Sequence, residues 1–227
     1  MSDGPAALAT DDNAGHADRM DRMYRYQRHI YDLTRKYYLL GRDRTIAALN
    51  VPEGGSLLEI GCGTGRNLAL ARRHFPTASL FGLDISSEML ATAQAKFSGN
   101  ASPPQLRVAD ATAFSAAVFG QPHFDRVMIS YALSMIPDWQ SAIDRGIEAI
   151  GPQGSLHIVD FGQQERLPAW FRGALQGWLA RFHVTPRADL HAMLEDRASA
   201  NGLNLTFEPL WRGYAWRAVL SRQEHAR

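Results

Sequence analysis

The chain has 227 residues, of which 45% are apolar and 21% are charged, as is typical of one globular domain. Its net charge of +1 gives no overall attraction to nucleic acid, so no nucleic-acid partner is expected. The single cysteine, Cys62, excludes an intrachain disulfide and has no neighbour at metal-ligand spacing, so no metal site is predicted. No apolar run is long enough to cross a membrane, and the first residues lack the apolar core of a signal peptide. We therefore expect a cytoplasmic protein.

Composition divides the chain into three segments. Residues 1–16 are rich in Ala, Gly, Asp and Ser without periodicity, which predicts a disordered tail. Residues 17–50 contain a proline-free stretch that predicts an N-terminal helical cap, with a break at Gly41. Residues 51–227 form the core.

The predicted cap carries tyrosine and arginine in alternation at spacings of four and three: Tyr24, Arg28, Tyr31, Arg35, Tyr38 and Arg42. This spacing puts all of them on one helical face. Arginine binds carboxylates through two parallel hydrogen bonds, and tyrosine rings attract methylated ammonium groups. The face could instead pack on the core, with the tyrosine rings buried and the arginine heads reaching solvent.

From residue 56 onward, predicted strands alternate with predicted helices. The expected strands are 56–60, 79–84, 105–109, 124–130 and 155–160, and the expected helices are 65–74, one beginning at Ser86 or Ser87, 138–150, 167–182 and 186–200. Segments 203–208 and 214–220 are expected to close the sheet as an antiparallel pair. Alternation of this kind predicts an α/β fold, with a mostly parallel, doubly wound, seven-stranded sheet and helices on both faces. Its ligand should lie at the carboxyl ends of the strands.

The first strand ends in a glycine turn, with Gly61, Gly63 and Gly65 at alternate positions after Glu59. Glycines allow a sharp turn and a close approach to a ligand. The second strand ends at Asp84, where a carboxylate can accept hydrogen bonds from two vicinal hydroxyls of a ribose. A strand, a glycine turn and an acid on the next strand together predict a site for a nucleoside-bearing cofactor.

The residues around the turn favour one class of cofactor. The dinucleotide fingerprint would need glycine at position 66, which holds Arg66, so a nicotinamide-dependent oxidoreductase is disfavoured. Glu59 suits a cationic ligand such as the ammonium and sulfonium of S-adenosylmethionine (SAM). The pattern E-x-G-x-G-x-G resembles motif I of the class I SAM-dependent methyltransferases, which implies their Rossmann-like fold and S-adenosyl-L-homocysteine (SAH) as the second product.

Cofactor roles follow from position. The glycines make room for the methionine part and the sugar, and Asp84 should hold the ribose. The remaining candidates are Ile85 and Met89 on the adenine face, Asp110 and Ala111 at the adenine amine, Ser130 beside the methyl group, and Tyr38 from the cap. Ile85 and Met89 could equally be plain core residues, and Asp110 could be a helix N-cap.

A narrower resemblance involves residues 31–44, 58–67 and 182–187. These stretches resemble the bacterial diacylglyceryl-homoserine N-methyltransferases of betaine-lipid (DGTS) synthesis. The resemblance implies three methyl transfers to the homoserine amine of a lipid, giving a trimethylated headgroup. The alternatives are methylation of a quinone or a soluble amine, or a SAM-binding regulator without catalysis.

An amine must be neutral to attack the methyl group, and a protein base could assist. The candidate catalytic residues are Tyr31, Tyr131 and His183, and the candidate cations for a substrate carboxylate are Arg35, Arg42 and Arg187.

The segment 168–182 predicts an amphipathic helix with Trp170, Phe171, Leu175 and Trp178 on one side and arginines beside them. Such a helix can lie in the headgroup layer of a membrane, which would place the protein peripherally on the inner membrane face beside its lipid substrate. The same face could instead pack on the core as a lid. The sequence makes no prediction of oligomeric state.

Overall fold

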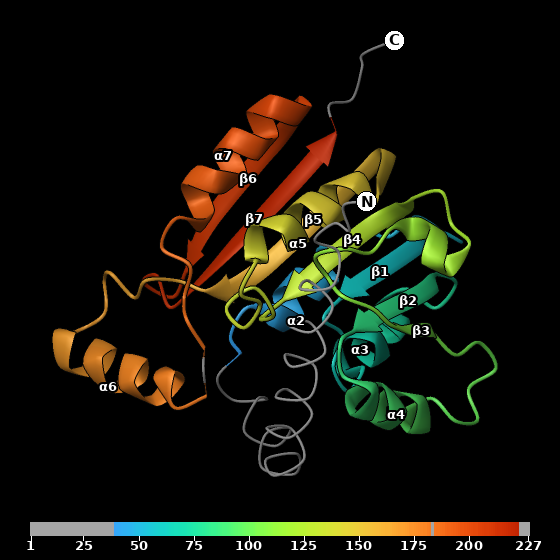
Figure 1. Ribbon diagram of the computed structural model, residues 1–227, viewed down its shortest axis with the longest axis horizontal. Coiled ribbons are helices and arrows are strands. Elements are labelled where there is room, and N and C mark those ends of the chain that lie inside the picture. The colour runs from blue at the N-terminus through green and yellow to red at the C-terminus, as the bar shows by residue number, and fades with distance from the viewer. Residues whose placement is uncertain (1–38, 183, 223–227) are drawn as a thin grey trace, which may run out of the picture.

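The computed structural model describes residues 39–182 and 184–222 (Figure 1). The tail at residues 1–16 and most of the predicted cap lie outside this range. So do the candidate site residues Tyr31, Arg35, Tyr38 and His183.

A seven-stranded sheet of order β3-β2-β1-β4-β5-β7-β6 organises the described chain and confirms the predicted α/β fold. Strands β1 to β5 run parallel, and β7 pairs antiparallel with both β5 and β6. The strands are β1 (Ser56–Ile60), β2 (Ser79–Asp84), β3 (Gln105–Val108), β4 (Phe124–Ser130), β5 (Ile150–Phe161), β6 (Leu203–Leu210) and β7 (Ala215–Arg222). The helices are α2 (Arg42–Ala47), α3 (Arg66–His74), α4 (Ser87–Lys96), the 3-10 helix η1 (Ala116–Phe119), α5 (Trp139–Glu148), α6 (Ala169–Ala180) and α7 (Leu190–Asn201).

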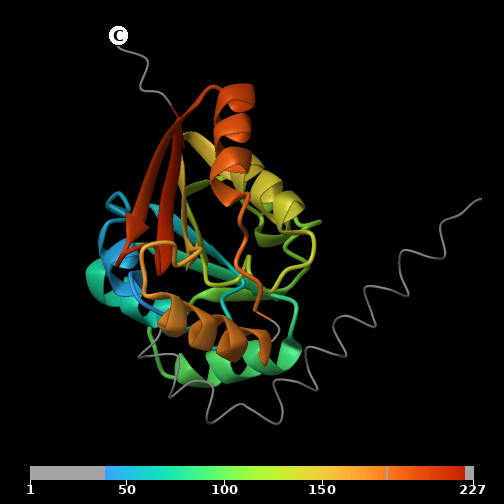
Figure 2. The ribbon, with the colours of Figure 1, turned by 90° about the vertical axis from the view of Figure 1, so that its left-hand side faces the viewer.

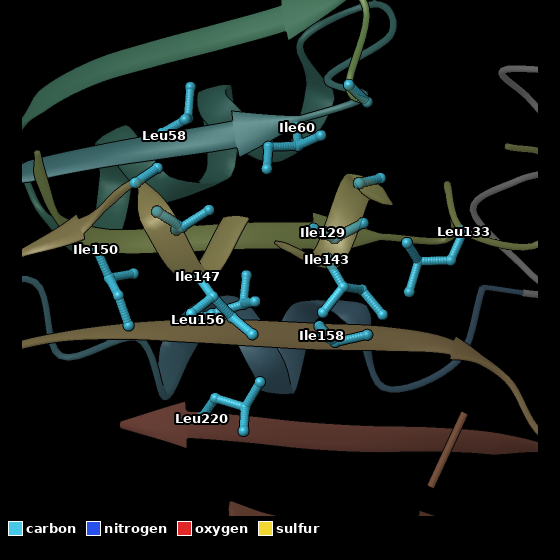
Figure 3. Close-up of a cluster of buried hydrophobic side chains, with 14 of the residues drawn as sticks. Leu58, Ile60, Ile129, Leu133, Ile143, Ile147, Ile150, Leu156, Ile158 and Leu220 are labelled. Carbon is cyan, nitrogen blue, oxygen red and sulfur yellow. The ribbon is translucent and has the colours of Figure 1, made fainter. Parts of the chain in front are cut away.

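Helices cover both faces of the sheet because side chains alternate along each strand. On β1, Leu58 and Ile60 join a core formed with α5 and α7 (Figure 3), whereas Leu57 joins a second core formed with α2, α3 and α4. On β4, Ile129 faces the first core and Met128 the second. The strands are therefore buried on both sides, as expected of a parallel sheet.

The largest differences from the expected element boundaries are at the start of β5 and at the start of α7. The helix expected to reach residue 150 ends at Glu148, and β5 already begins at Ile150, which pairs with Phe124 of β4. The helix expected from residue 186 begins only at Leu190, because the preceding residues bind the loop after β4, with Thr185 N donating to Ser134 O at 2.9 Å. In both places, tertiary pairing overrides local helical preference.

Helix α6 stands apart from the two faces of the sheet (Figures 1 and 2). It packs through Leu179 and, in part, through Trp178 against a third cluster that includes Leu39, Tyr131 and Phe161. Among the described helices, α6 included, none has both the length and the apolar character that crossing a bilayer requires.

Candidate active site

The site lies where the strand order reverses, between β1 and β4. From β1 the chain proceeds outward to β2 and β3, and from β4 it proceeds in the other direction to β5. The loops that leave β1 and β4 therefore diverge to opposite faces, which leaves a crevice at their carboxyl ends. The loops are in close contact at its base, since a Cβ on Gly61 would lie 2.8 Å from the Cβ of Ala132.

The glycine turn has the backbone that the sequence predicts. Gly61, Gly63 and Gly65 have φ values of 70°, 52° and 70°, in the left-handed region that favours glycine. The turn is anchored from both sides: Cys62 N donates to Leu83 O at 2.9 Å, and Lys96 Nζ donates to Thr64 O at 2.7 Å. The turn thus has no side chain at three alternate positions, which fits the close approach of a SAM molecule to its backbone.

Asp84 joins β2 to the glycine turn. Its Oδ2 accepts from Gly63 N at 2.8 Å and its Oδ1 accepts from Ser86 N at 3.0 Å. These two bonds fix the orientation of the carboxylate at the end of β2, beside the glycine turn. The predicted role therefore fits the geometry, and Asp84 has a second role in holding the turn.

Glu59 is placed differently from the expectation. Its side chain is fully buried beneath the turn, and its Oε1 accepts from Asn67 Nδ2 at 2.6 Å. The residue thus ties β1 to the first turn of α3. Sequence reasoning missed Asn67, although an amide in the first turn after a glycine loop is a usable signal.

The negative charge around the glycine turn affects the pKa of the Cys62 thiol. Burial, and then the carboxylates of Asp84 and Glu59, raise the pKa of the thiol well above its usual value. The thiol is therefore neutral and unreactive. The same negative potential favours a cationic ligand at this place.

Asp110, the candidate for contact with the adenine amine, begins a turn and not a helix. Its Oδ1 accepts from both the amide and the hydroxyl of Thr112 at 2.8 Å. Ile85 is half-buried, whereas Met89 and Ala111 are buried. The exposed edge of Ile85 makes it the stronger candidate for contact with a base.

Strand β4 ends at Ser130, the candidate for the position beside the methyl group. Its buried hydroxyl has no hydrogen-bond partner in the described range. Tyr131 follows with a φ of 53° and a buried ring that packs edge-on against Phe161, with 4.7 Å between centroids. Its hydroxyl donates to Leu40 O at 2.5 Å, and burial raises its pKa well above the usual value. At neutral pH, Tyr131 is thus a hydrogen-bond donor and not a base, and it ties the start of the described chain to the site.

The two described arginine candidates are also held by the protein. Arg187 donates from Nε to Leu133 O at 3.0 Å and from Nη2 to Ile136 O at 2.6 Å, which brings residues 184–187 across the loop after β4. Arg42 is buried in α2 and donates to Asp43. Arg187 thus lies beside the loop after β4, and two of its guanidinium nitrogens already bind carbonyls of this loop.

Asp160, which sequence reasoning did not single out, is a buried carboxylate at the end of β5. Its Oδ2 accepts from Ser134 N at 3.1 Å and its Oδ1 from Phe161 N at 2.7 Å. Burial raises its pKa to about 6. An acid at a strand end, the pattern that identified Asp84, was the available signal.

The chain resembles known methyltransferases. A family model described as "Methyltransferase domain" matches residues 57–154. A demethylmenaquinone methyltransferase of Bacillus licheniformis is 31% identical over 125 residues, which cover 55% of this chain and 52% of that protein. A phosphatidylethanolamine N-methyltransferase of Cereibacter sphaeroides is 31% identical over 146 residues, which cover 63% of this chain and 67% of that protein.

The chain spans little more than half the length of the demethylmenaquinone methyltransferases it matches, at 52% and 59% for two of them. Among solved structures, the plantazolicin methyltransferase BpumL in complex with a substrate analog and SAH has a TM-score of 0.68 at 11% identity, covering 94% of this chain and 99% of that chain. At this identity the likeness shows the fold.

Proposed function

Because the chain belongs to the class I SAM-dependent methyltransferases, we propose that it methylates a small acceptor molecule bound beside the loop after β4. SAM is the methyl donor and supplies an activated methyl group. The observation that carries the proposal is the glycine turn after β1, which is bound by Asp84, together with the pairing of β1 with β4, the strand that ends at Ser130. A cytoplasmic location, with peripheral attachment to the membrane, belongs to the same proposal.

A quinone ring is the acceptor that the relatives favour. Several of them are demethylmenaquinone methyltransferases, at 26–31% identity. These relatives support the quinone alternative more than they support a betaine lipid. The relevant surface of the acceptor would then be an aromatic ring, which needs apolar walls and a proton acceptor for the ring hydroxyl.

A lipid amine is the second candidate, and a different observation favours it. The phosphatidylethanolamine N-methyltransferase matches two thirds of its own length to this chain. Together with the resemblance of residues 31–44 and 182–187 to diacylglyceryl-homoserine N-methyltransferases, it supports a headgroup amine that is methylated to the trimethylated betaine lipid.

The residues have distinct tasks in either reaction. Asp84 and the glycine turn hold the donor, and the crevice holds the acceptor in line with the methyl group, which supplies much of the acceleration. Tyr31 and His183 remain the candidate bases, and Arg35, Arg42 and Arg187 remain the candidates for a substrate carboxylate. A diacylglyceryl-homoserine lipid carries a carboxylate and would need these arginines, whereas a quinone ring would not.

A substrate panel tests the proposal. The protein is incubated with methyl-labelled SAM and with detergent micelles of a demethylated quinone, diacylglyceryl-homoserine or phosphatidylethanolamine, and the products are identified by mass spectrometry. Label in one acceptor identifies the substrate class. If SAM binds but no acceptor in a broad panel takes up label, the chain is a SAM-binding regulator and the proposal fails.

A further inference from the structure

Large aromatic side chains are exposed in two places of the described chain that the active site does not explain. Trp170 is 76% exposed and Phe171 is 38% exposed at the start of α6, and Trp211 is 48% exposed in the turn between β6 and β7. The rings of Trp170 and Phe171 pack edge-on, with centroids 5.7 Å apart. Exposed aromatic rings of this size mark an interaction surface when they lie together.

Backbone hydrogen bonds bring the two places together. The segment that leaves β5 runs along the β6–β7 turn, with Gln164 N donating to Gly213 O at 2.9 Å and Arg166 N donating to Arg212 O at 3.2 Å. Trp170 follows Arg166 by only four residues, and Trp211 directly precedes Arg212. Both views of the molecule place α6 and this turn on the same side (Figures 1 and 2).

The same region is basic. Arg166 and Arg212 are exposed and Arg172 is partly exposed. The acid next to Arg166 in sequence is Glu165, and its carboxylate lies against Gly213. We define the docking surface as Trp170, Phe171 and Trp211 with Arg166, Arg172 and Arg212. Indole rings at the headgroup level with arginines beside them match the chemistry of an anionic lipid surface.

The two halves of α6 differ in exposure. This difference bears on the two alternatives that its sequence leaves open, packing on the core and facing a membrane. Its C-terminal half packs on the protein through Leu179 and Trp178. Its N-terminal half carries the exposed pair. Trp178 is half-buried in the third cluster, so the large apolar residues of α6 do not all share one exposed face.

We propose that the docking surface binds the protein to an anionic bilayer, beside the entrance for its acceptor. The surface connects to the active site through the protein: the Trp211 ring packs against Gly41, and Tyr131 binds the adjacent Leu40 carbonyl. Docking itself follows from exposure and charge, and only the delivery of the acceptor rests on the proposed function.

Vesicle flotation tests the docking. The full chain is mixed with phosphatidylcholine vesicles with and without phosphatidylglycerol, at low and high salt. We expect binding only to the anionic vesicles at low salt. The double variants Trp170→Ser/Trp211→Ser and Arg166→Glu/Arg212→Glu should each lower binding by about tenfold or more.

Matched controls lie at the other edge of the sheet. Val118 is 43% exposed in η1, which contacts β3, and Arg107 is an exposed arginine on β3. Val118→Ser and Arg107→Glu should bind as the unchanged protein does. Equal loss of binding in these controls, or no flotation of the unchanged protein at low salt, would overturn the proposal.

A second measurement remains decisive if the serine variants fail to fold. In vesicles of brominated lipid, the fluorescence of Trp170 and Trp211 should be quenched, and Trp170→Phe/Trp211→Phe should still bind while losing most of that quenching. Equal quenching in the phenylalanine variant would contradict the assigned surface. Methylation of a micellar acceptor is measured in parallel, so that failure of docking is distinguishable from failure of the proposed function.

Discussion

Asp84 shows how one side chain can serve both fold and ligand. Its two oxygens accept backbone hydrogen bonds from Gly63 and Ser86, so it is oriented before any ligand arrives. A carboxylate fixed in this way loses little conformational entropy when it binds ribose hydroxyls.

We expect Asp84→Asn to weaken SAM binding by tenfold or more, measured by calorimetry, because an amide cannot accept from both amides and also from the ribose. Charge-assisted hydrogen bonds contribute about 1.5–3 kcal/mol each. Asp125→Asn is a matched control, because Asp125 also accepts from a backbone amide and a hydroxyl, both of Ser56, at the opposite end of β1. Unchanged affinity in folded Asp84→Asn would remove Asp84 from the cofactor site.

Asp160 makes stability depend on pH. Burial raises its pKa from 3.8 to about 6, so the folded state binds a proton more tightly than the unfolded state does. Its contribution is therefore fully present below about pH 4 and is lost as the pH rises through 6. His157 acts in the opposite sense, because burial lowers its pKa to about 3, and its contribution is lost as the pH falls below 6.5.

The effect of Asp160 is isolated by comparison with Asp160→Asn, which keeps His157. Between pH 4 and pH 7, we expect the free energy of unfolding of the unchanged protein to fall relative to the variant, by up to about 3 kcal/mol. Urea unfolding at a series of pH values measures this difference. A constant difference across the range would mean that Asp160 does not titrate there.

At the scale of elements, the packing of α3 on β2 sets the position of the glycine turn. Gly82 lies at the contact, where an added Cβ would lie 2.8 Å from Cys62 Sγ, 2.9 Å from Leu68 Cδ1 and 3.0 Å from Leu106 Cδ2. The absence of a side chain on β2 thus lets the turn and α3 approach the sheet.

We expect Gly82→Ala to lower the free energy of unfolding by about 1–3 kcal/mol, because the core would be overpacked. The same displacement should weaken SAM binding, since Cys62 belongs to the turn. Gly177→Ala in α6 is the matched control: nothing lies within 4 Å of its Cβ position, so the protein should be as stable or slightly more stable. Thermal melts of both variants decide; equal melting temperatures would contradict the packing argument.

At the scale of the whole molecule, the first described residues, Leu39 and Leu40, contact the Tyr131 side chain at the end of β4. Leu39 packs in the cluster that contains Tyr131, and Leu40 accepts the Tyr131 hydrogen bond. The tyrosine and arginine face precedes these residues directly in sequence. We therefore propose that residues 17–38 complete the acceptor side.

Two deletions separate the tail from this segment. Removing residues 1–16 should leave the melting temperature and turnover unchanged. Removing residues 1–38 should abolish methyl transfer while leaving the described core folded, as judged by circular dichroism. The point variants Tyr31→Ala and Arg35→Ala should lower turnover more than they lower the melting temperature, with the exposed Arg44→Ala as control. Retained turnover in the longer deletion would show that the segment is not part of the site.

The sequence by itself determined the fold class, the strands that carry the site and the SAM cofactor. Local patterns sufficed there, because a glycine turn between buried strands has few alternative conformations, and Ser56–Ile60 and Phe124–Ser130 form strands as predicted. The early end of α5, the late start of α7 and the division of α6 were not predictable, since they depend on partners distant in sequence.

Only the tertiary structure decided what the polar side chains do. In the structure, Glu59 accepts a hydrogen bond from Asn67 and the Tyr131 hydroxyl donates to the Leu40 carbonyl. Arg187 donates to carbonyls of the loop after β4. The tertiary structure also revealed the buried Asp160 and bound the segment before α6 to the turn that carries Trp211. Sequence spacing shows which side chains share an element or a strand end. Burial and hydrogen-bond partners come from segments that are distant along the chain, and they determine whether a polar group supports the fold or is available to a ligand.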